Sequence, residues 1–451
     1  MFAIKKKVRE LCIKLKILCF GTLLIYIYII LNINYWKDNR SLHWDKSGYY
    51  AFLPATFIYH DLDRMDFITP MNEKYHFVPG VDYYGLVEQS NGKRLERYHL
   101  GVSLFQLPFF AIAHLVTVST EVYPADGYSP YYMLAVCISS AFWAVLGLYI
   151  LGAFLRRYFN DYSTVFAVLL LAFGTNLYAY STFETGMSHP YSFFLIACVL
   201  NFTDMWYKTG RKKWVVLLGL TFGLIFIVRP VNIICLLLPL LWQTDTQRLK
   251  NRLAFFLEQK ANIIIAIVVG IAVCAVQFAY WKYVTGDWLV YAYKDEHFNF
   301  ADPRIWDGLF SYRKGWFIYT PIALVAFLGF FLNRYTRLLP ALLLTIAVAI
   351  YVTFSWEQWY YGGSFGCRPL IDFLAVMAFP LASVIQYLSE RRKMLSVASS
   401  ILLFAFIFLS LWQTFQFKKG VIPWDKTTRA YYWKVFFDIK PNPEYQKLLD
   451  K

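Results

Sequence analysis

The chain has 451 residues, of which 58% are hydrophobic, 20% aromatic and only 16% charged. This composition excludes a soluble multidomain protein and indicates a polytopic membrane protein. The formal net charge of +15 would suggest a nucleic-acid partner in a soluble chain. Here basic residues between hydrophobic segments account for the charge, so no nucleic acid is expected.

The N-terminal segment predicts an uncleaved first span. Lys5, Lys6 and Lys7 precede an apolar run that ends near Ile33. The charge pattern resembles a signal peptide, but the run is too long and lacks a small-x-small cleavage motif. We therefore expect a cytoplasmic N-terminus followed by the first transmembrane helix.

Further apolar segments follow along the whole chain. A helix needs about 20 apolar residues to cross the hydrocarbon core. Candidate spans lie at 17–34, 131–155, 163–181, 189–207, 214–228, 231–243, 261–285, 316–333, 338–355, 371–388 and 394–414. The predicted fold class is therefore an all-α polytopic membrane protein with about eleven transmembrane helices.

Clusters of basic residues orient these spans. The clusters lie at 4–16, 156–157, 208–213, 248–260, 334–337 and 391–393, and the positive-inside rule places all of them in the cytoplasm. Residues 1–414 then form the transmembrane domain, with long outer loops at 35–130, 286–315 and 356–370. The tail, residues 415–451, is expected on the same non-cytoplasmic side.

Residues 100–120 are apolar enough to form another span. If they crossed the membrane, every later basic cluster would lie outside. We therefore predict a juxtamembrane or half-inserted helix on the outer face, which Gln106, Pro108 and His114 also allow.

Asp45 is the first candidate functional residue. It follows the first span by about ten positions, on the predicted outer side, and Trp44, Tyr49 and Tyr50 lie in its flanks. The flanks predict a helix at the membrane interface. A carboxylate beside apolar surface has a raised proton affinity, which suits a general base. The alternative is a solvated loop acid.

Arg368 is the second candidate, because it follows a segment with three glycines at the outer start of a span. Glycines allow a ligand to approach the backbone, and arginine can bind two phosphate oxygens at once. The alternative is an ion pair between Arg368 and Asp372 that stabilises a helix end. Arg313 and Lys314 form a second outer basic point that can assist with the phosphate of a lipid.

Several other polar residues are expected to line a substrate cavity. Arg229 ends an apolar helix, where an unpaired arginine costs about 2.5–3.5 kcal/mol, so it should face a cavity, a partner acid or the outer interface. Glu184 and His189 lie in an outer turn, which they either cap or open to substrate. Tyr49 and Glu357 complete the predicted lining.

An acidic string, His60, Asp61, Asp63 and Asp66, raises the question of a metal. Carboxylate oxygens suit magnesium or manganese. Short Asp-x-Asp strings are common in ordinary loops, however, so no metal or other cofactor is favoured, and Asp61 and Asp63 are weak candidates. The seven cysteines lie in or beside apolar runs without paired spacing and are predicted to be packing residues.

Certain features occur in a recognisable order: a first span, the Trp44-Asp45 loop, juxtamembrane segments at 51–59 and 100–120, and the segments 173–189, 223–230 and 365–368. This order resembles the GT-C superfamily of polytopic glycosyltransferases, which includes the protein O-mannosyltransferases and the lipid A aminoarabinose transferases. The resemblance implies sugar transfer from a polyprenyl-phosphate donor on the non-cytoplasmic face. It also implies that Asp45 is the base and that Arg368, with Arg313, holds the donor phosphate.

The predicted activity is thus an inverting glycosyl transfer to a glycan, lipid or protein acceptor, without a metal, in a bacterial inner membrane. A lipid-linked sugar flippase is the alternative. Transport would place charged residues through the membrane midplane, whereas here nearly all lie at the outer rim. In a third interpretation the protein is a noncatalytic scaffold, and its function would then survive substitution of both Asp45 and Arg368.

Overall fold

The computed structural model describes residues 2–38, 40–80, 83–242, 248–293, 296–332, 337–391 and 393–450. Of the basic residues that orient the spans, Arg334 and Arg392 lie outside the described residues. The chain is 69% helical. Its two short strands, β1 (Leu86–Glu88) and β2 (Arg94–Glu96), pair antiparallel. These observations confirm the predicted all-α class.

Among the described residues, five helices are long and apolar enough, by length and composition, to cross a membrane. They are α1 (Phe2–Ile33), α4 (Gly101–Thr120), α5 (Pro130–Leu155), α12 (Lys260–Thr285) and α18 (Lys393–Lys418). The other α-helices are α2 (Asp45–Phe57), α3 (Ile68–Tyr75), α6 (Asp161–Phe173), α7 (Leu177–Thr182), α8 (His189–Thr209), α9 (Lys212–Val228), α10 (Leu237–Leu241), α11 (Arg248–Glu258), α13 (Ile305–Phe310), α14 (Trp316–Tyr319), α15 (Pro321–Leu328), α16 (Leu339–Phe354), α17 (Leu374–Ser389) and α19 (Arg429–Lys434). Short 3₁₀ helices are η1 (Arg40–Leu42), η2 (Pro230–Leu236), η3 (Gly329–Phe331), η5 (Arg368–Ile371) and η6 (Pro443–Leu448).

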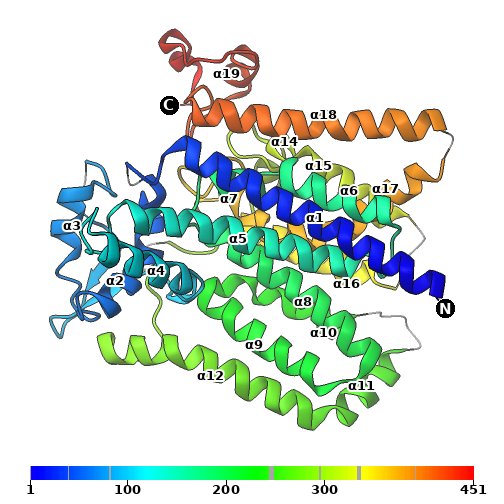
Figure 1. The fold of residues 1–451 in the computed structure, drawn as a ribbon, viewed down its shortest axis with the longest axis horizontal. Helices are drawn as coiled ribbons and strands as arrows, with labels where there is room; N and C mark the ends of the chain where they lie inside the picture. Colours follow the sequence, from blue (N-terminus) through cyan, green and yellow to red (C-terminus); the bar gives the residue numbers. More distant parts are fainter. Residues whose placement is uncertain are drawn as a thin grey trace.

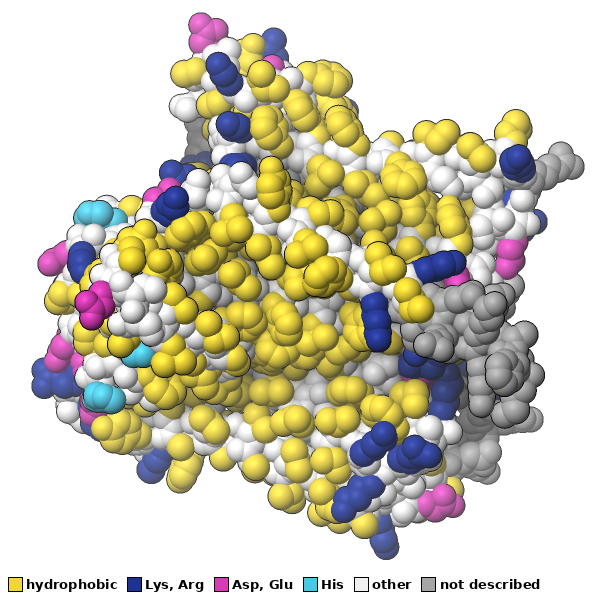
Figure 2. All heavy atoms as spheres, viewed as in Figure 1, with side chains coloured by type: hydrophobic (Ala, Val, Ile, Leu, Met, Phe, Trp, Pro, Cys, Tyr) yellow, Lys and Arg dark blue, Asp and Glu magenta, His cyan; other side chains and the backbone are white. Residues whose placement is uncertain are grey.

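The long helices form a bundle with two different ends (Figure 1). The N-terminus lies at one end, and α2, α3 and the β1–β2 hairpin gather at the other. Hydrophobic side chains cover the middle of the face shown in Figure 2, and Lys and Arg side chains gather near the end that holds the N-terminus. An apolar band between polar ends is what a helix bundle in a bilayer requires.

Three predicted spans are not single helices. Residues 163–181 form α6 and α7, residues 316–333 begin as α14 and continue as α15 and η3, and residues 231–243 begin as η2 and α10. The single-helix prediction is wrong there. Gly174 and Pro321 lie at the first two breaks, and Pro239 is the third residue of α10, directly after η2. Irregular backbone within a membrane protein is tolerated where protein surrounds it.

Two of these breaks meet the loop before Arg368. Asn176, between α6 and α7, donates from Nδ2 to the carbonyl oxygen of Cys367 (3.3 Å). Its Oδ1 accepts a hydrogen bond from Thr320 Oγ1 (3.2 Å), at the start of α15. The broken helices therefore fix the backbone that carries Arg368.

Helix α4 packs on the first half of α5. The Phe105 and Trp143 rings are 4.8 Å apart, and the Phe110 and Tyr132 rings are 5.3 Å apart. His114 Nδ1 also lies 2.6 Å from the Tyr132 hydroxyl. Length and composition would let α4 cross a membrane, but these contacts reach only partway along α5. The half-inserted position stays a prediction that these contacts support.

Close packing of α9 on α12 depends on glycines. A Cβ atom at Gly219 would lie 2.1 Å from the carbonyl oxygen of Ala266, and one at Gly223 would lie 2.7 Å from that of Gly270. Small residues four positions apart allow two helix backbones to approach within a membrane. The Gly-x-x-x-Gly spacing is visible in the sequence and is the signal that predicts this pair.

Helix α18 continues to Lys418, past residue 414 where the last predicted span ends. The tail then packs back on α18. The Trp412 Nε1–H donates to the carbonyl oxygen of Phe436 (2.7 Å), and Gln416 Nε2 donates to that of Val435 (2.8 Å). The tail is thus attached to the end of α18.

Candidate active site

Asp45 is the first residue of α2, and the residue before it has an unusual backbone conformation. Trp44 has a φ of 60° and a ψ of −131°, which is rare for a bulky side chain. The Trp44 N–H donates to the carbonyl oxygen of Phe77 (3.2 Å), and Ser47 Oγ donates to that of Trp44 (2.6 Å). These bonds set the direction in which α2 begins, and with it the position of Asp45.

The carboxylate of Asp45 is held from three sides. Its Oδ1 accepts hydrogen bonds from the hydroxyls of Tyr84 (2.9 Å) and Tyr98 (2.8 Å). Its Oδ2 lies 3.0 Å from Arg368 Nη2, and the two side chains remain 24% and 18% exposed. The structure therefore brings together the two residues that the sequence ranks first, at a place that a substrate can reach.

Electrostatics keep this pair charged. Burial acts to raise the pKa of Asp45, but the positive charge of Arg368 and the hydrogen bonds from Tyr98 and Tyr84 outweigh burial, so the pKa lies below its ordinary value. Burial acts to lower the pKa of Arg368, but Asp45, together with Tyr180, Tyr49 and Tyr98, outweighs burial and raises the pKa. A carboxylate offers about four acceptor positions. Three are used here, which leaves one for a proton from a substrate.

The sequence allowed an ion pair between Arg368 and Asp372. The structure does not form it, because the carboxylate beside Arg368 belongs to Asp45. Asp372 is fully buried. Its Oδ1 lies 2.8 Å from His189 Nδ1, and its Oδ2 accepts a hydrogen bond from Asn232 Nδ2 (2.8 Å) and lies 3.6 Å from Arg229 Nε. Of the three situations expected for Arg229, a cavity, a partner acid or the outer interface, the structure shows a partner acid.

The two remaining interior residues of the predicted cavity lie near Asp45. The Tyr49 ring is 4.9 Å from that of Tyr98, which donates to Asp45. Glu184 forms an ion pair with Lys46 (2.7 Å), the residue after Asp45. Lys46 therefore lies beside the site, although no feature of its local sequence indicates a role. Its buried ammonium ties the start of α2 to the turn before α8.

Glu357 lies farther out. Its Oε2 is 3.3 Å from His297 Nδ1, and its side chain is 51% exposed. The Glu357 N–H donates to the carbonyl oxygen of His297 (3.1 Å). These contacts connect the predicted outer loops 286–315 and 356–370 at the surface.

Arg313 and Lys314 are engaged by the tail and not by Asp45. Arg313 donates from Nε and Nη2 to the two carboxylate oxygens of Asp425, both at 2.8 Å. Lys314 is 3% exposed, and its Nζ donates to the carbonyl oxygens of Ser364 and Trp424. Burial lowers the pKa of Lys314 to about 7. These contacts support a structural role, in which the two residues join the loop before Arg368 to the tail.

The acidic string does not form the ligand set that its Asp-x-Asp spacing suggested. Asp61 accepts from the backbone N–H groups of Arg64 (3.2 Å) and Asp66 (2.6 Å), and Asp63 pairs with Lys93 (3.3 Å). Across the residues that the structure describes, no group of three or more His, Cys, Asp or Glu side chains is placed to hold a metal ion. The cysteines with described side chains, Cys19, Cys137, Cys198, Cys235, Cys274 and Cys367, are free, and all except Cys274 are buried.

Sequence reasoning missed the tyrosines that hold Asp45. Tyr84 and Tyr98 lie in the long loop between α2 and α4, next to the β1–β2 hairpin. The loop has no helical or strand periodicity long enough to orient their side chains in advance. The abundance of tyrosines near Asp45 in the sequence is the one available signal, and it does not show which hydroxyl groups contact the carboxylate.

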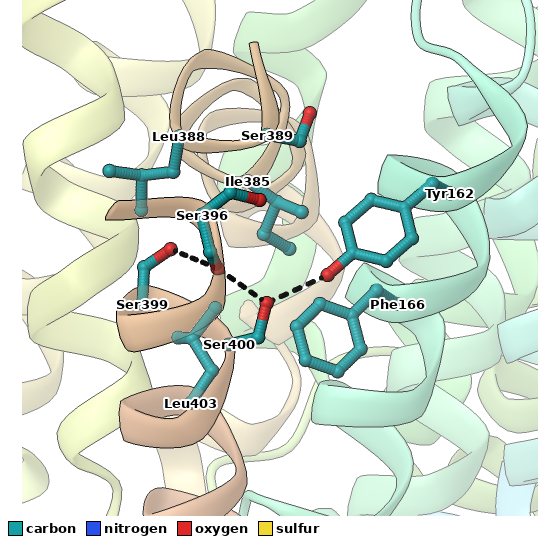
Figure 3. Close-up of a pocket in the computed structure, with 9 residues that line it drawn as sticks. All are labelled: Tyr162, Phe166, Ile385, Leu388, Ser389, Ser396, Ser399, Ser400 and Leu403. Atoms are coloured by element: carbon teal, nitrogen blue, oxygen red, sulfur yellow. Dashed lines mark hydrogen bonds between the residues drawn. The ribbon is translucent and has the colours of Figure 1, made fainter. Parts of the chain in front are cut away.

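A small separate pocket lies between the start of α6, the end of α17 and the start of α18 (Figure 3). Tyr162 and Ser400 face each other across it, with their hydroxyls 3.0 Å apart. Its lining is Tyr162, Phe166, Ile385, Leu388, Ser389, Ser396, Ser399, Ser400 and Leu403. None of these side chains carries a charge, and none contributes to the Asp45 site.

No protein-family model matches the chain, and no curated protein matches it. The structure is similar to the crystal structure of ArnT from Cupriavidus metallidurans bound to undecaprenyl phosphate, with a TM-score of 0.51 and 12% sequence identity. The similarity covers 89% of this chain and 65% of the ArnT chain. At this identity it shows the fold. Together with the apolar helices, it confirms the predicted all-α, multi-pass membrane protein.

Proposed function

We propose that this protein is an integral membrane glycosyltransferase that moves a sugar from a polyprenyl-phosphate donor to an acceptor, with inversion at the anomeric carbon. The observation that carries the proposal is the Asp45–Arg368 pair, a carboxylate 3.0 Å from a guanidinium and reachable from outside. The fold shared with ArnT, a protein crystallised with undecaprenyl phosphate, supports a lipid-phosphate ligand.

In the proposed reaction, Arg368 binds the phosphate of the donor. The acceptor hydroxyl or amine attacks the anomeric carbon while Asp45 takes its proton. The bond between that carbon and the phosphate oxygen breaks, and its electron pair stays on the phosphate, which leaves as polyprenyl phosphate. Arg368 stabilises the charge that develops on the leaving group.

Donor binding also prepares Asp45. In the donor-free protein, Arg368 helps to keep the pKa of Asp45 low, which makes the carboxylate a weak base. A donor phosphate that shares the guanidinium removes part of this effect and adds a negative charge nearby, and both changes raise the pKa. Asp45 therefore becomes a stronger base when the donor is in place.

Sugar release by the purified protein in nanodiscs tests the proposal. A panel of labelled polyprenyl-phosphate sugars is supplied with candidate glycan, lipid and peptide acceptors, and release of polyprenyl phosphate is followed. Asp45→Asn should lower turnover at least about 100-fold with donor binding retained. Asp66→Asn is the matched control, because Asp66 is an acid of the same loop that is 56% exposed and pairs with Arg64 and Arg94 away from Asp45.

Arg368→Gln should weaken donor binding, whereas Arg304→Gln, an exposed arginine paired with Asp302, should not. Near-normal turnover in Asp45→Asn would remove Asp45 from the mechanism. Donor that binds to the wild type but is not cleaved, with any acceptor, would instead support the flippase. The proposed location is a bacterial inner membrane, with the Asp45 site on the non-cytoplasmic face.

A further inference from the structure

Glu96, at the end of β2, is a buried carboxyl group that the proposed reaction does not use. It is 0% exposed. Its Oε2 accepts a hydrogen bond from the Tyr83 hydroxyl (2.6 Å), and its Oε1 accepts one from the backbone N–H of Tyr98 (3.3 Å). Its own backbone N–H donates to the Tyr280 hydroxyl (3.0 Å). A buried carboxyl group is costly unless it makes such bonds, so each bond fixes a neighbour in place.

The first turn of α2 packs directly on Glu96 and Tyr98. A Cβ atom at Gly48 would lie 2.2 Å from Tyr98 Cδ2 and 2.8 Å from Glu96 Oε1. Gly48 follows Asp45 by three residues, so the two lie on the same side of the helix. Only glycine allows this approach, and the approach is what brings the Tyr98 hydroxyl within 2.8 Å of Asp45 Oδ1.

We propose that Glu96 is a positioning residue for Asp45: it holds Tyr98, whose hydroxyl, with that of Tyr84, orients the Asp45 carboxylate. The functional importance of this arrangement rests on the proposed role of Asp45 as base. The arrangement itself exists in the protein without substrate, and it can therefore be tested without a sugar donor.

The Glu96 carboxyl group should change its charge near neutral pH. Burial raises its pKa to about 7, although the hydrogen bonds from Tyr83 and Tyr98 act to lower it. Arg97, Tyr128 and Tyr280 are the other charged or titratable groups that face it. Hydrogen bonds to an ionised carboxylate are roughly twice as strong as neutral ones. Tyr98 is therefore held best when Glu96 is ionised, above about pH 7.

Infrared difference spectroscopy of the donor-free protein, as a function of pH, measures both carboxyl groups. Bands that disappear in Asp45→Asn belong to Asp45, and bands that disappear in Glu96→Gln belong to Glu96. Tyr98→Phe should move the Asp45 titration to a pH about one unit higher, which corresponds to the loss of one hydrogen bond. The Asp45 pKa lies below its ordinary value, so Asp45 titrates where Glu96 is already protonated and where glutamine would replace it without a change of charge. Glu96→Ala, which removes the acceptor of the Tyr98 N–H, should therefore move the Asp45 titration in the same direction, and the double variant Glu96→Ala, Tyr98→Phe no further than Tyr98→Phe alone.

Glu88→Ala is the matched control, since Glu88 is exposed on β1 of the same hairpin and should leave the Asp45 titration unchanged. An Asp45 titration that stays in place in Glu96→Ala, while Tyr98→Phe moves it, overturns the proposal. If Glu96→Ala does not fold, Tyr83→Phe removes one bond to Glu96 and should shift the Asp45 titration in the same direction; no shift overturns the proposal.

Transfer assays separate this proposal from the proposed function. Glu96→Gln should lower kcat about tenfold, the equivalent of one hydrogen bond, with the donor KM unchanged. It should also remove the limb of the kcat–pH profile near pH 7. No transfer by the wild type would defeat the proposed function while the infrared titration still decides the role of Glu96. Normal transfer by Glu96→Gln with an Asp45 titration unmoved in Glu96→Ala would defeat only the role of Glu96.

Discussion

Removal of the Asp372 carboxylate should cause a large loss of stability. Asp372 is 0% exposed and lies 2.8 Å from His189, 2.8 Å from Asn232 and 3.6 Å from Arg229. Asp372→Ala leaves a guanidinium that is only 19% exposed without its anion, and it leaves the two other groups without an acceptor. Breaking a buried ion pair on one side costs about 3–5 kcal/mol.

The free energy of unfolding can be measured by equilibrium titration with sodium dodecyl sulfate in mixed micelles, with tryptophan fluorescence as the signal. Asp66→Ala is the control, because its 56% exposed carboxylate pairs with Arg64 and Arg94 near the surface, and each such pair contributes less than about 1 kcal/mol. The double variant Arg229→Met, Asp372→Leu should recover much of the loss, because it leaves no unpaired charge.

Two results would refute this reasoning. If Asp372→Ala costs no more than Asp66→Ala, the Asp372 carboxylate does not compensate Arg229. If the double variant is as unstable as Asp372→Ala, the loss comes from packing and not from the unpaired guanidinium.

Two further predictions use the same unfolding assay. Gly219→Ala should lower the free energy of unfolding by about 1–3 kcal/mol, because its Cβ atom would lie 2.1 Å from the Ala266 carbonyl oxygen. Gly21→Ala is the control and should not destabilise the protein, because its Cβ atom would have nothing within 4 Å. Equal effects of the two substitutions would show that α9 and α12 can separate freely. For Glu96, the pKa in the folded protein is raised from 4.5 to about 7, so its contribution is fully present below about pH 4.5 and is lost as the pH rises through 7. Wild-type stability should fall by up to about 3 kcal/mol over this range, and Glu96→Gln should remove that part of the dependence; a pH dependence that survives the substitution would assign it to other groups.

Much of the candidate site was predictable because its residues differ chemically from their local sequence. Asp45 and Arg368 are charged residues at the ends of apolar segments, where a charge is costly and therefore indicates a function. Their partners were less accessible to prediction. Asp372 lies four residues after Arg368. Local spacing alone does not show whether Arg368 pairs with Asp372 or with Asp45. The structure selects Asp45 because the loop before Arg368 is fixed by Asn176.

For Arg313 and Lys314, the local sequence does not identify the partners that the structure shows. Two basic residues beside a span predict a lipid-phosphate contact from composition alone. The structure instead directs Arg313 to Asp425 and Lys314 to backbone carbonyl groups. Both partners depend on where the tail returns, which no local pattern specifies.

The sequence by itself determined the membrane class, the positions of most apolar segments and the two charged residues at the centre of the site, because hydrophobicity and charge are local properties. Only the tertiary structure decided that Asp45 faces Arg368, that Tyr84 and Tyr98 hold Asp45, and that three predicted spans are broken. These features arise where segments distant in the chain meet, and the packing of broken helix ends against one another determines which segments do so.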